Sequence, residues 1–134
     1  MVIWHDPTAL SWPDPTAPVR DLSASDLQAR LKGDEPLTLL DVREPSERAF
    51  CSISVRPPAS ELQIRMTEIP QRVGDIQAAL ARGPLVVYCH HGVRSSQVVG
   101  WLAEQGISGV LNLKGGIDAW SLEVDPSVRR YRLY

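Results

Sequence analysis

Short runs of consecutive apolar residues alternate along this chain with segments whose apolar residues recur at helical spacing. The apolar runs are typical of strands buried on both faces of a sheet, and they lie at residues 37–42, 85–88 and 110–113. The helical spacing predicts helices near residues 23–32, 45–50, 71–82, 95–105 and 117–120. Alternating strands and helices favour right-handed crossovers, so we expect a largely parallel sheet with helices on both faces.

Turn and capping residues support several of these boundaries. Ser23, followed by Asp26 three positions later, has the form of a capping box at a helix start. The Gly-Pro pair at residues 83–84 ends one predicted helix, and Gly106 ends another. Residues 51–70 are punctuated by prolines and only weakly periodic, so no element with defined ends is predicted there.

The first 18 residues differ from the rest, since prolines and tryptophans replace any regular apolar spacing. We interpret residues 1–18 as an irregular arm and residues 19–134 as one domain. The tryptophans of the arm, Trp4 and Trp12, are expected to pack onto the domain surface, because large aromatic side chains favour a partner. Disorder of the arm is the alternative.

Composition restricts the possible functions. The chain has 134 residues, 43% of them hydrophobic and 22% charged, which suits one globular domain. A formal net charge of -2 leaves no basic excess, so a nucleic-acid partner is not expected. No apolar stretch of about 18 residues occurs, so membrane association is not expected. Without an export signal we expect the cytoplasm, where Cys51 and Cys89 stay reduced.

Cys89 directly follows a predicted buried strand and precedes a predicted helix. Main-chain N–H groups and the positive helix end converge at such a place, and they favour an ionised, nucleophilic sulfur. Gly92 lets the loop curl around that sulfur, and Arg94 adds a permanent cation suited to an oxyanion or a charged donor. Because ligands bind outside the carboxyl ends of parallel strands, Asp41 and Arg43 are expected on the same rim, where they orient loops rather than react.

Some of these residues have a second interpretation. The loop from Cys89 to Arg94 is C-x4-R, one residue shorter than the C-x5-R loop of cysteine phosphatases, which disfavours phosphate. Arg94 either contacts an anion or pairs with a carboxylate such as Asp41. His90 and His91 are expected at the pocket mouth rather than on a metal ion, because no further Cys or His cluster completes a set of ligands.

Three segments, in this order along the chain, resemble signatures of the rhodanese superfamily. Residues 40–44 resemble its D-V-R-E strand, residues 89–95 after the V-V-Y strand resemble its active-site loop, and residues 113–120 resemble its closing GG-x-x-x-W segment. The resemblance covers about residues 19–120. It implies an α/β fold with a central five-stranded parallel sheet flanked by helices on both faces.

The resemblance also implies a sulfurtransferase of the thiosulfate type. In that cycle Cys89 attacks the outer sulfur of thiosulfate or a related persulfide, holds it as a persulfide, and passes it to a thiophilic acceptor. The expected partners are therefore a small anionic sulfur donor and, as acceptor, cyanide, a thiol or a protein cysteine. No metal and no organic cofactor is implied. The N–H groups of the loop are expected to stabilise the persulfide, which assigns substrate binding to His90, His91, Gly92, Val93, Arg94 and Ser95.

The middle of the chain departs from the family pattern. Residues 50–55 stand where the family has G-H-I-P-G-A, and only Ile53 matches plainly, whereas residues 68–72 resemble rhodanese domains attached to sulfur-carrier activating enzymes. Cys51 is expected to be structural, with a resolving thiol as the alternative. The alternative functions are a non-catalytic or sulfur-relay interaction module and, with less support, a cysteine phosphatase or arsenate reductase.

Overall fold

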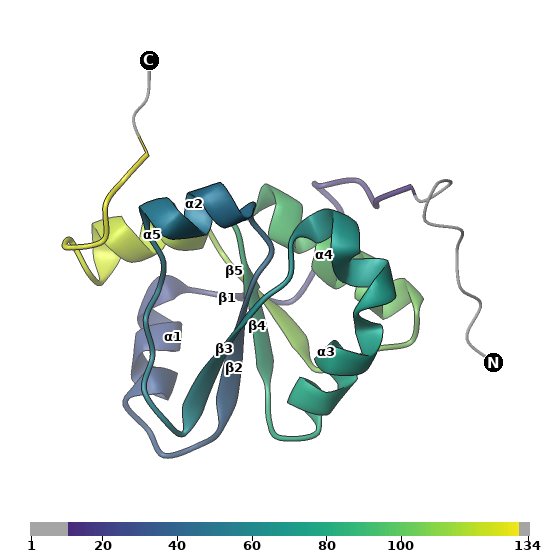
Figure 1. Ribbon diagram of the computed structural model, residues 1–134, viewed down its shortest axis with the longest axis horizontal. Helices are drawn as coiled ribbons and strands as arrows, with labels where there is room; N and C mark the ends of the chain where they lie inside the picture. The colour runs from purple at the N-terminus through teal and green to yellow at the C-terminus, as the bar shows by residue number, and fades with distance from the viewer. Residues whose placement is uncertain (1–10, 132–134) are drawn as a thin grey trace.

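The computed structural model describes residues 11–131 and has an α/β fold around a parallel five-stranded sheet (Figure 1). The strand order is β1-β5-β4-β2-β3, and every pair of neighbours is parallel. The strands are β1 (Asp21–Leu22), β2 (Leu37–Asp41), β3 (Ala59–Gln63), β4 (Leu85–Tyr88) and β5 (Val110–Leu113). The predicted parallel sheet is confirmed, and β4 lies at its centre.

Helices cover both faces of the sheet, as predicted. The helices are α1 (Ala24–Leu31), α2 (Pro45–Phe50), η2 (Met66–Gln71, a 3-10 helix), α3 (Val73–Leu80), α4 (Val93–Glu104) and α5 (Gly116–Glu123). In Figure 1, α1 and α5 lie to the left of the sheet, and α3 and α4 lie to its right. The sheet is therefore buried on both sides, which explains why every residue of β2 and β4 is buried and most of them are apolar.

Successive side chains of β4 point to opposite faces, and this alternation places the thiol. Val86 and Tyr88 belong to the apolar cluster under α1 and α5. Leu85, Val87 and the following Cys89 belong to the cluster under α3 and α4. Since side chains alternate with a period of two along a strand, Cys89 points to the α4 face at the end of the central strand.

The structure differs from the sequence-based expectations at four places, one of which is η2, since no element with defined ends was predicted in most of that stretch. The strand β1 was not predicted, because two residues are too few to carry a pattern. The strand β3 was also missed, since as an edge strand it is only partly buried and mostly polar. Helix α4 begins at Val93 rather than near Ser95, because Gly92 at φ 95° caps it, so Arg94 lies in the first helical turn.

The described part of the arm lies along α4. The Trp12 ring contacts the Trp101 ring edge to face at 5.9 Å, and Gln97 Nε2 donates to the Pro13 carbonyl at 2.9 Å. The expected packing of Trp12 is confirmed, whereas Trp4 lies outside the described residues. None of the helices within residues 11–131 combines the length and the apolar character needed to cross a bilayer.

Candidate active site

The sulfur of Cys89 is buried among polar groups of its own loop. The Cys89 side chain is only 1% exposed. Its Sγ accepts the N–H of Gly92 at 3.1 Å and the N–H of Ser95 at 3.4 Å, and it lies 3.3 Å from Ser95 Oγ. The amides are therefore turned toward the sulfur, as the loop sequence predicts, although Cys89 also packs against the apolar cluster under α4.

A chain of hydrogen bonds behind the sulfur defines the direction of each donor. Asn112 Nδ2 donates to Asp21 Oδ1 at 3.0 Å, which turns Asn112 Oδ1 toward Ser95. Ser95 Oγ donates its single proton to that oxygen at 2.5 Å. Since the hydroxyl proton is used there, Oγ is left to accept from the Cys89 thiol, and an ionised sulfur requires the hydroxyl to rotate.

Two glycines let the loop adopt this shape. At Gly92, a Cβ atom would lie 3.2 Å from the nitrogen of Gly115 and would also be strained by the positive φ. At Gly116, a Cβ atom would overlap the carbonyl oxygens of Cys89 and His90. Those oxygens instead accept N–H groups from the start of α5, Ile117 at 2.9 Å and Asp118 at 3.1 Å. The carbonyls of the loop thus face α5 while its amides face the sulfur.

Arg94 is held by a carboxylate that the sequence did not suggest. Its Nη1 and Nη2 lie 2.7 Å and 2.9 Å from the two carboxylate oxygens of Glu47, on α2. This guanidinium lowers the pKa of Glu47 to about 2, so the pair is ionised at neutral pH. Asp41, the carboxylate named from the sequence as a partner for Arg94, pairs with other arginines, which makes that part of the prediction wrong.

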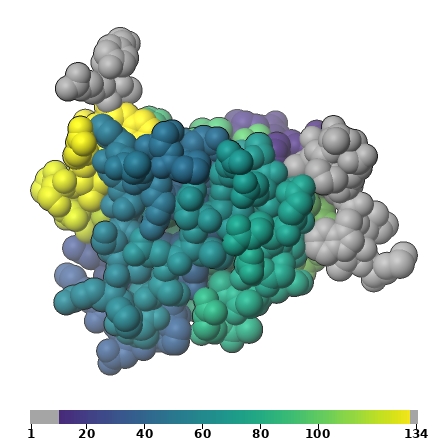
Figure 2. Space-filling view, viewed as in Figure 1, coloured from purple at the N-terminus to yellow at the C-terminus, as the bar shows by residue number. Residues whose placement is uncertain are grey.

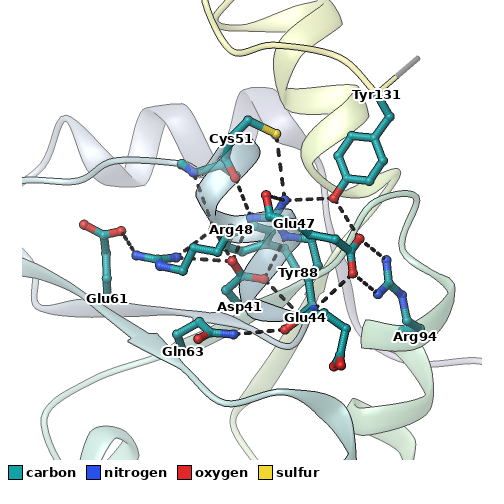
Figure 3. A network of polar contacts seen from close by, with 12 residues as sticks. Asp41, Glu44, Glu47, Arg48, Cys51, Glu61, Gln63, Tyr88, Arg94 and Tyr131 are labelled. Carbon is teal, nitrogen blue, oxygen red and sulfur yellow. Dashed lines mark hydrogen bonds and ion pairs between the residues drawn. The ribbon is translucent and has the colours of Figure 1, made fainter.

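A second polar cluster lies on the same rim, and Figure 3 draws most of it. Arg43 has a fully buried side chain, and its Nε and Nη2 donate to the two oxygens of Asp41 at 2.8 Å and 2.7 Å. Arg48 Nη1 adds a longer contact to Asp41 at 3.2 Å. No hydrogen bond or ion pair within residues 11–131 joins Asp41 or Arg43 to Cys89, so both lie beside the loop rather than in it.

The histidines form part of a stacked group at the loop surface. The rings of His90 and Tyr131 are parallel, 9° apart in angle and 3.6 Å apart at their centroids, and His91 lies 3.8 Å from His90. Burial lowers the pKa of His90, which favours its neutral form. Val93 is 52% exposed. Among the residues that the structure describes, no three His, Cys, Asp or Glu side chains gather as a metal site.

Cys51 lies at the C-terminal end of α2 and is half-buried. Its Sγ is 3.8 Å from Arg43 Nη1, and its carbonyl accepts Arg43 Nη2 at 2.8 Å. Both cysteines are free thiols. The contacts of Cys51 are thus with the buried arginine, and the role of a resolving thiol stays a prediction.

Sequence reasoning missed Glu47, Asn112 and Tyr131. Asn112 did carry a signal, because it is the polar residue within the apolar run of β5. Glu47 completes a capping box with Glu44, a pattern that reports the start of α2 but not the pairing with Arg94. Tyr131 follows the last regular element, and no local pattern indicates where it lies.

Comparison with known proteins gives the same family as the sequence of the thiol loop indicates. The sequence matches the rhodanese-like domain family over residues 23–123. A sulfurtransferase of Allochromatium vinosum is 36% identical over 105 residues, which cover 77% of this chain and 89% of that protein. Rhodanese-like/PpiC domain-containing protein 12 of Arabidopsis thaliana is 35% identical over 118 residues, which cover 85% of this chain and 38% of that protein.

A solved structure agrees with these matches. The crystal structure of a rhodanese-related protein from Thermoplasma volcanium has a TM-score of 0.66 and 30% identity, covering 84% of this chain and 100% of that chain. The chain belongs to the rhodanese-like domain family, as its three sequence signatures predict. Its similarity to a protein named sulfurtransferase supports a sulfurtransferase type of enzyme.

Proposed function

We propose that this protein transfers sulfane sulfur, from thiosulfate or a persulfide donor to a thiophilic acceptor, through a persulfide on Cys89. The observation that carries this proposal is the orientation of the loop, whose amides at Gly92 and Ser95 point at one sulfur atom. Dipoles arranged before the reaction stabilise negative charge without the cost of reorganising solvent. A persulfide anion formed at Cys89 meets the same donors.

The chemistry has two balanced steps. The Cys89 thiolate attacks the outer sulfur of thiosulfate, a new S–S bond forms, and the old S–S bond breaks with its electron pair leaving on sulfite. With a persulfide donor the leaving group is the donor thiolate. In the second step cyanide or a thiolate attacks the outer sulfur of the Cys89 persulfide, which returns the Cys89 thiolate and releases thiocyanate or a new persulfide.

The other predicted site residues have supporting roles in this proposal. Loop residues His90 to Ser95 surround the incoming donor. Arg94, in the first turn of α4, contributes a cation, and Glu47 holds its guanidinium in place. Asp41 and Arg43 form a buried ion pair that keeps the neighbouring end of β2 in place. The cycle needs no metal or organic cofactor, and it suits the cytoplasm, where the two thiols stay reduced.

The decisive experiment is intact-mass measurement after incubation with thiosulfate and removal of excess donor. We expect the native chain and Cys51→Ser to gain one sulfur atom that cyanide removes, and we expect no gain in Cys89→Ser. Equal gain in native and Cys89→Ser chains, with none in Cys51→Ser, would instead make Cys51 the nucleophile.

No gain in any chain, with either thiosulfate or a persulfide of a small thiol, would contradict the proposal and favour a non-catalytic interaction module. Release of phosphate from an aryl phosphate, measured in parallel, tests the phosphatase alternative. We expect none above the Cys89→Ser background.

A further inference from the structure

Tyr131 lies beyond residue 123, where the family match ends, yet it contacts the thiol loop. Its ring stacks on His90, the neighbour of Cys89 in the chain, at 3.6 Å between centroids. On α2, the Phe50 ring makes an edge-to-face contact with the Tyr131 ring, with 5.7 Å between their centroids. The C-terminal segment is thereby brought onto α2, and Figure 2 shows its yellow atoms packed against the blue atoms of that region.

The hydroxyl of Tyr131 joins the two sides of the rim. It donates to Glu47 Oε2 at 2.8 Å and accepts from Arg43 Nη1 at 2.9 Å. Figure 3 shows Tyr131 and Arg94 both pointing at the Glu47 carboxylate. Burial raises the pKa of Tyr131 to about 12, so the hydroxyl keeps its proton at neutral pH and can donate. The segment is held a second time one residue earlier, where Arg130 Nε donates to Asp118 Oδ1 at 2.8 Å.

These contacts have a consequence for access to the sulfur. The Cys89 side chain is 1% exposed, so no donor reaches it in this arrangement. The back of the sulfur is closed by Ser95, Asn112 and the central strand, which are buried parts of the core. His90 and Arg94 of the loop are half-buried, and half-buried Tyr131 lies against both, because it stacks on His90 and donates to the Glu47 oxygen that Arg94 contacts. Tyr131 belongs to a segment with no regular structure.

We infer that the segment after α5 that contains Arg130 and Tyr131 covers the thiol loop. A sulfur donor must displace Tyr131, whose contacts hold this cover closed, to reach Cys89. The inference rests on the proposed function for its purpose, but not for its geometry. The ring closes the loop surface by stacking on His90, and the hydroxyl fastens the ring to Glu47 and Arg43. Tyr131 is therefore a residue that sets access, and it takes no part in making or breaking bonds.

Access is measured by the rate at which iodoacetamide alkylates Cys89, in chains that all carry Cys51→Ser. Tyr131→Ala removes the ring and the hydroxyl, and we expect alkylation to be at least about tenfold faster. Tyr131→Phe keeps the ring and loses two hydrogen bonds, so we expect a rise of about threefold. Leu122→Ala, which shortens a 61% exposed side chain on α5, is the control and should not change the rate.

A structural role alone would act through global unfolding, so the urea midpoint of each variant is measured beside its alkylation rate. We expect alkylation of Tyr131→Phe in 0 M urea to be faster than global unfolding, calculated from its measured free energy of unfolding, can account for. Tyr131→Ala already removes the stacking contact between Tyr131 and His90. Adding His90→Ala to it should therefore give no further rise in the alkylation rate. Should Tyr131→Ala fail to fold, the Phe variant and His90→Ala decide the question.

Equal alkylation rates in the Tyr131, His90 and Leu122 variants would overturn the inference. That result is distinct from failure of the proposed function, in which the parent chain takes up no sulfur whatever its alkylation rate. If both hold, the rate of sulfur loading from thiosulfate should rise in the same order as alkylation across the variants.

Discussion

Two polar clusters lie at the same edge of the sheet and are built in different ways. The thiol cluster consists of Asp21, Cys89, Gly92, Ser95 and Asn112, and its contacts to sulfur come from main-chain amides and a hydroxyl. The ion cluster consists of Asp41, Arg43, Arg48, Glu61 and Tyr88, and its contacts are mostly ion pairs. The thiol cluster surrounds the Cys89 sulfur, and the ion cluster contains the buried ion pair of Asp41 and Arg43.

The difference teaches where charge is useful in this fold. Burying a charge costs free energy unless the charge is paired and hydrogen-bonded. The guanidinium of Arg43 accordingly donates to Asp41, to Tyr131 and to main-chain carbonyls. The sulfur is left to neutral dipoles: the amides of Gly92 and Ser95 already point at it, and only the Ser95 hydroxyl has to rotate when the sulfur is ionised. We therefore expect the ion cluster to control stability and the thiol cluster to control reactivity.

The largest expected effect is on the ion cluster. Asp41→Asn leaves Arg43 buried without its counter-ion, and we expect the free energy of unfolding to fall by about 3–5 kcal/mol. Urea unfolding at pH 7 measures it. Arg65→Gln, which breaks an exposed pair with Glu68, should leave the midpoint unchanged. A chain with Asp41→Asn that is as stable as the parent would remove the distinction between the two clusters.

Gly116→Ala tests the carbonyl side of the thiol loop. The new Cβ would overlap the carbonyl oxygens of Cys89 and His90 at a residue with φ 64°, and we expect a loss of at least about 2 kcal/mol. Gly74→Ala on α3 is the matched control, because nothing lies within 4 Å of its Cβ position. It should stabilise the chain by up to about 1 kcal/mol in the same urea titration.

Ser95→Ala sharpens the comparison, because it should affect rate more than stability. It removes the hydroxyl between Sγ and Asn112, and we expect sulfur loading from thiosulfate to slow by about tenfold, measured by mass over time. The next residue provides the control, since Ser96 Oγ donates to main-chain carbonyls away from the sulfur. Equal rates in Ser95→Ala and Ser96→Ala would show that the hydroxyl is not used.

The smallest effect concerns Glu47, which connects Arg94 to Tyr131. Its pKa is lowered from 4.5 to about 2, so its ionised form stabilises the fold fully above pH about 4.5 and loses that contribution as the pH falls toward 2. We expect Glu47→Gln to be less stable than the parent at pH 7 by under about 1 kcal/mol after solvent screening. Unfolding curves at successively lower pH should converge, and a gap that widens instead would contradict this assignment.

The sequence predicted the elements that have strong local signals. The strands β2, β4 and β5 are buried on both faces, and so their apolar runs were plain, and the helix α2 begins and ends as predicted. The thiol loop was also predictable, since its residues are contiguous. What local reasoning does not reach is pairing across long separations, such as Glu47 with Arg94 or Tyr131 with His90. Those partners are decided by how α2 and the C-terminal segment pack.

The central position of β4 has a consequence for hydrogen exchange around the site. Amide hydrogens of a strand with paired neighbours on both sides exchange with deuterium mainly through global opening of the protein. Val86 and Val87, just behind Cys89, should therefore be among the last amides to exchange, and the peptides around Tyr131 among the first. Cys89 thus follows the strand that we expect to open least, whereas the segment stacked on its loop is expected to open most readily.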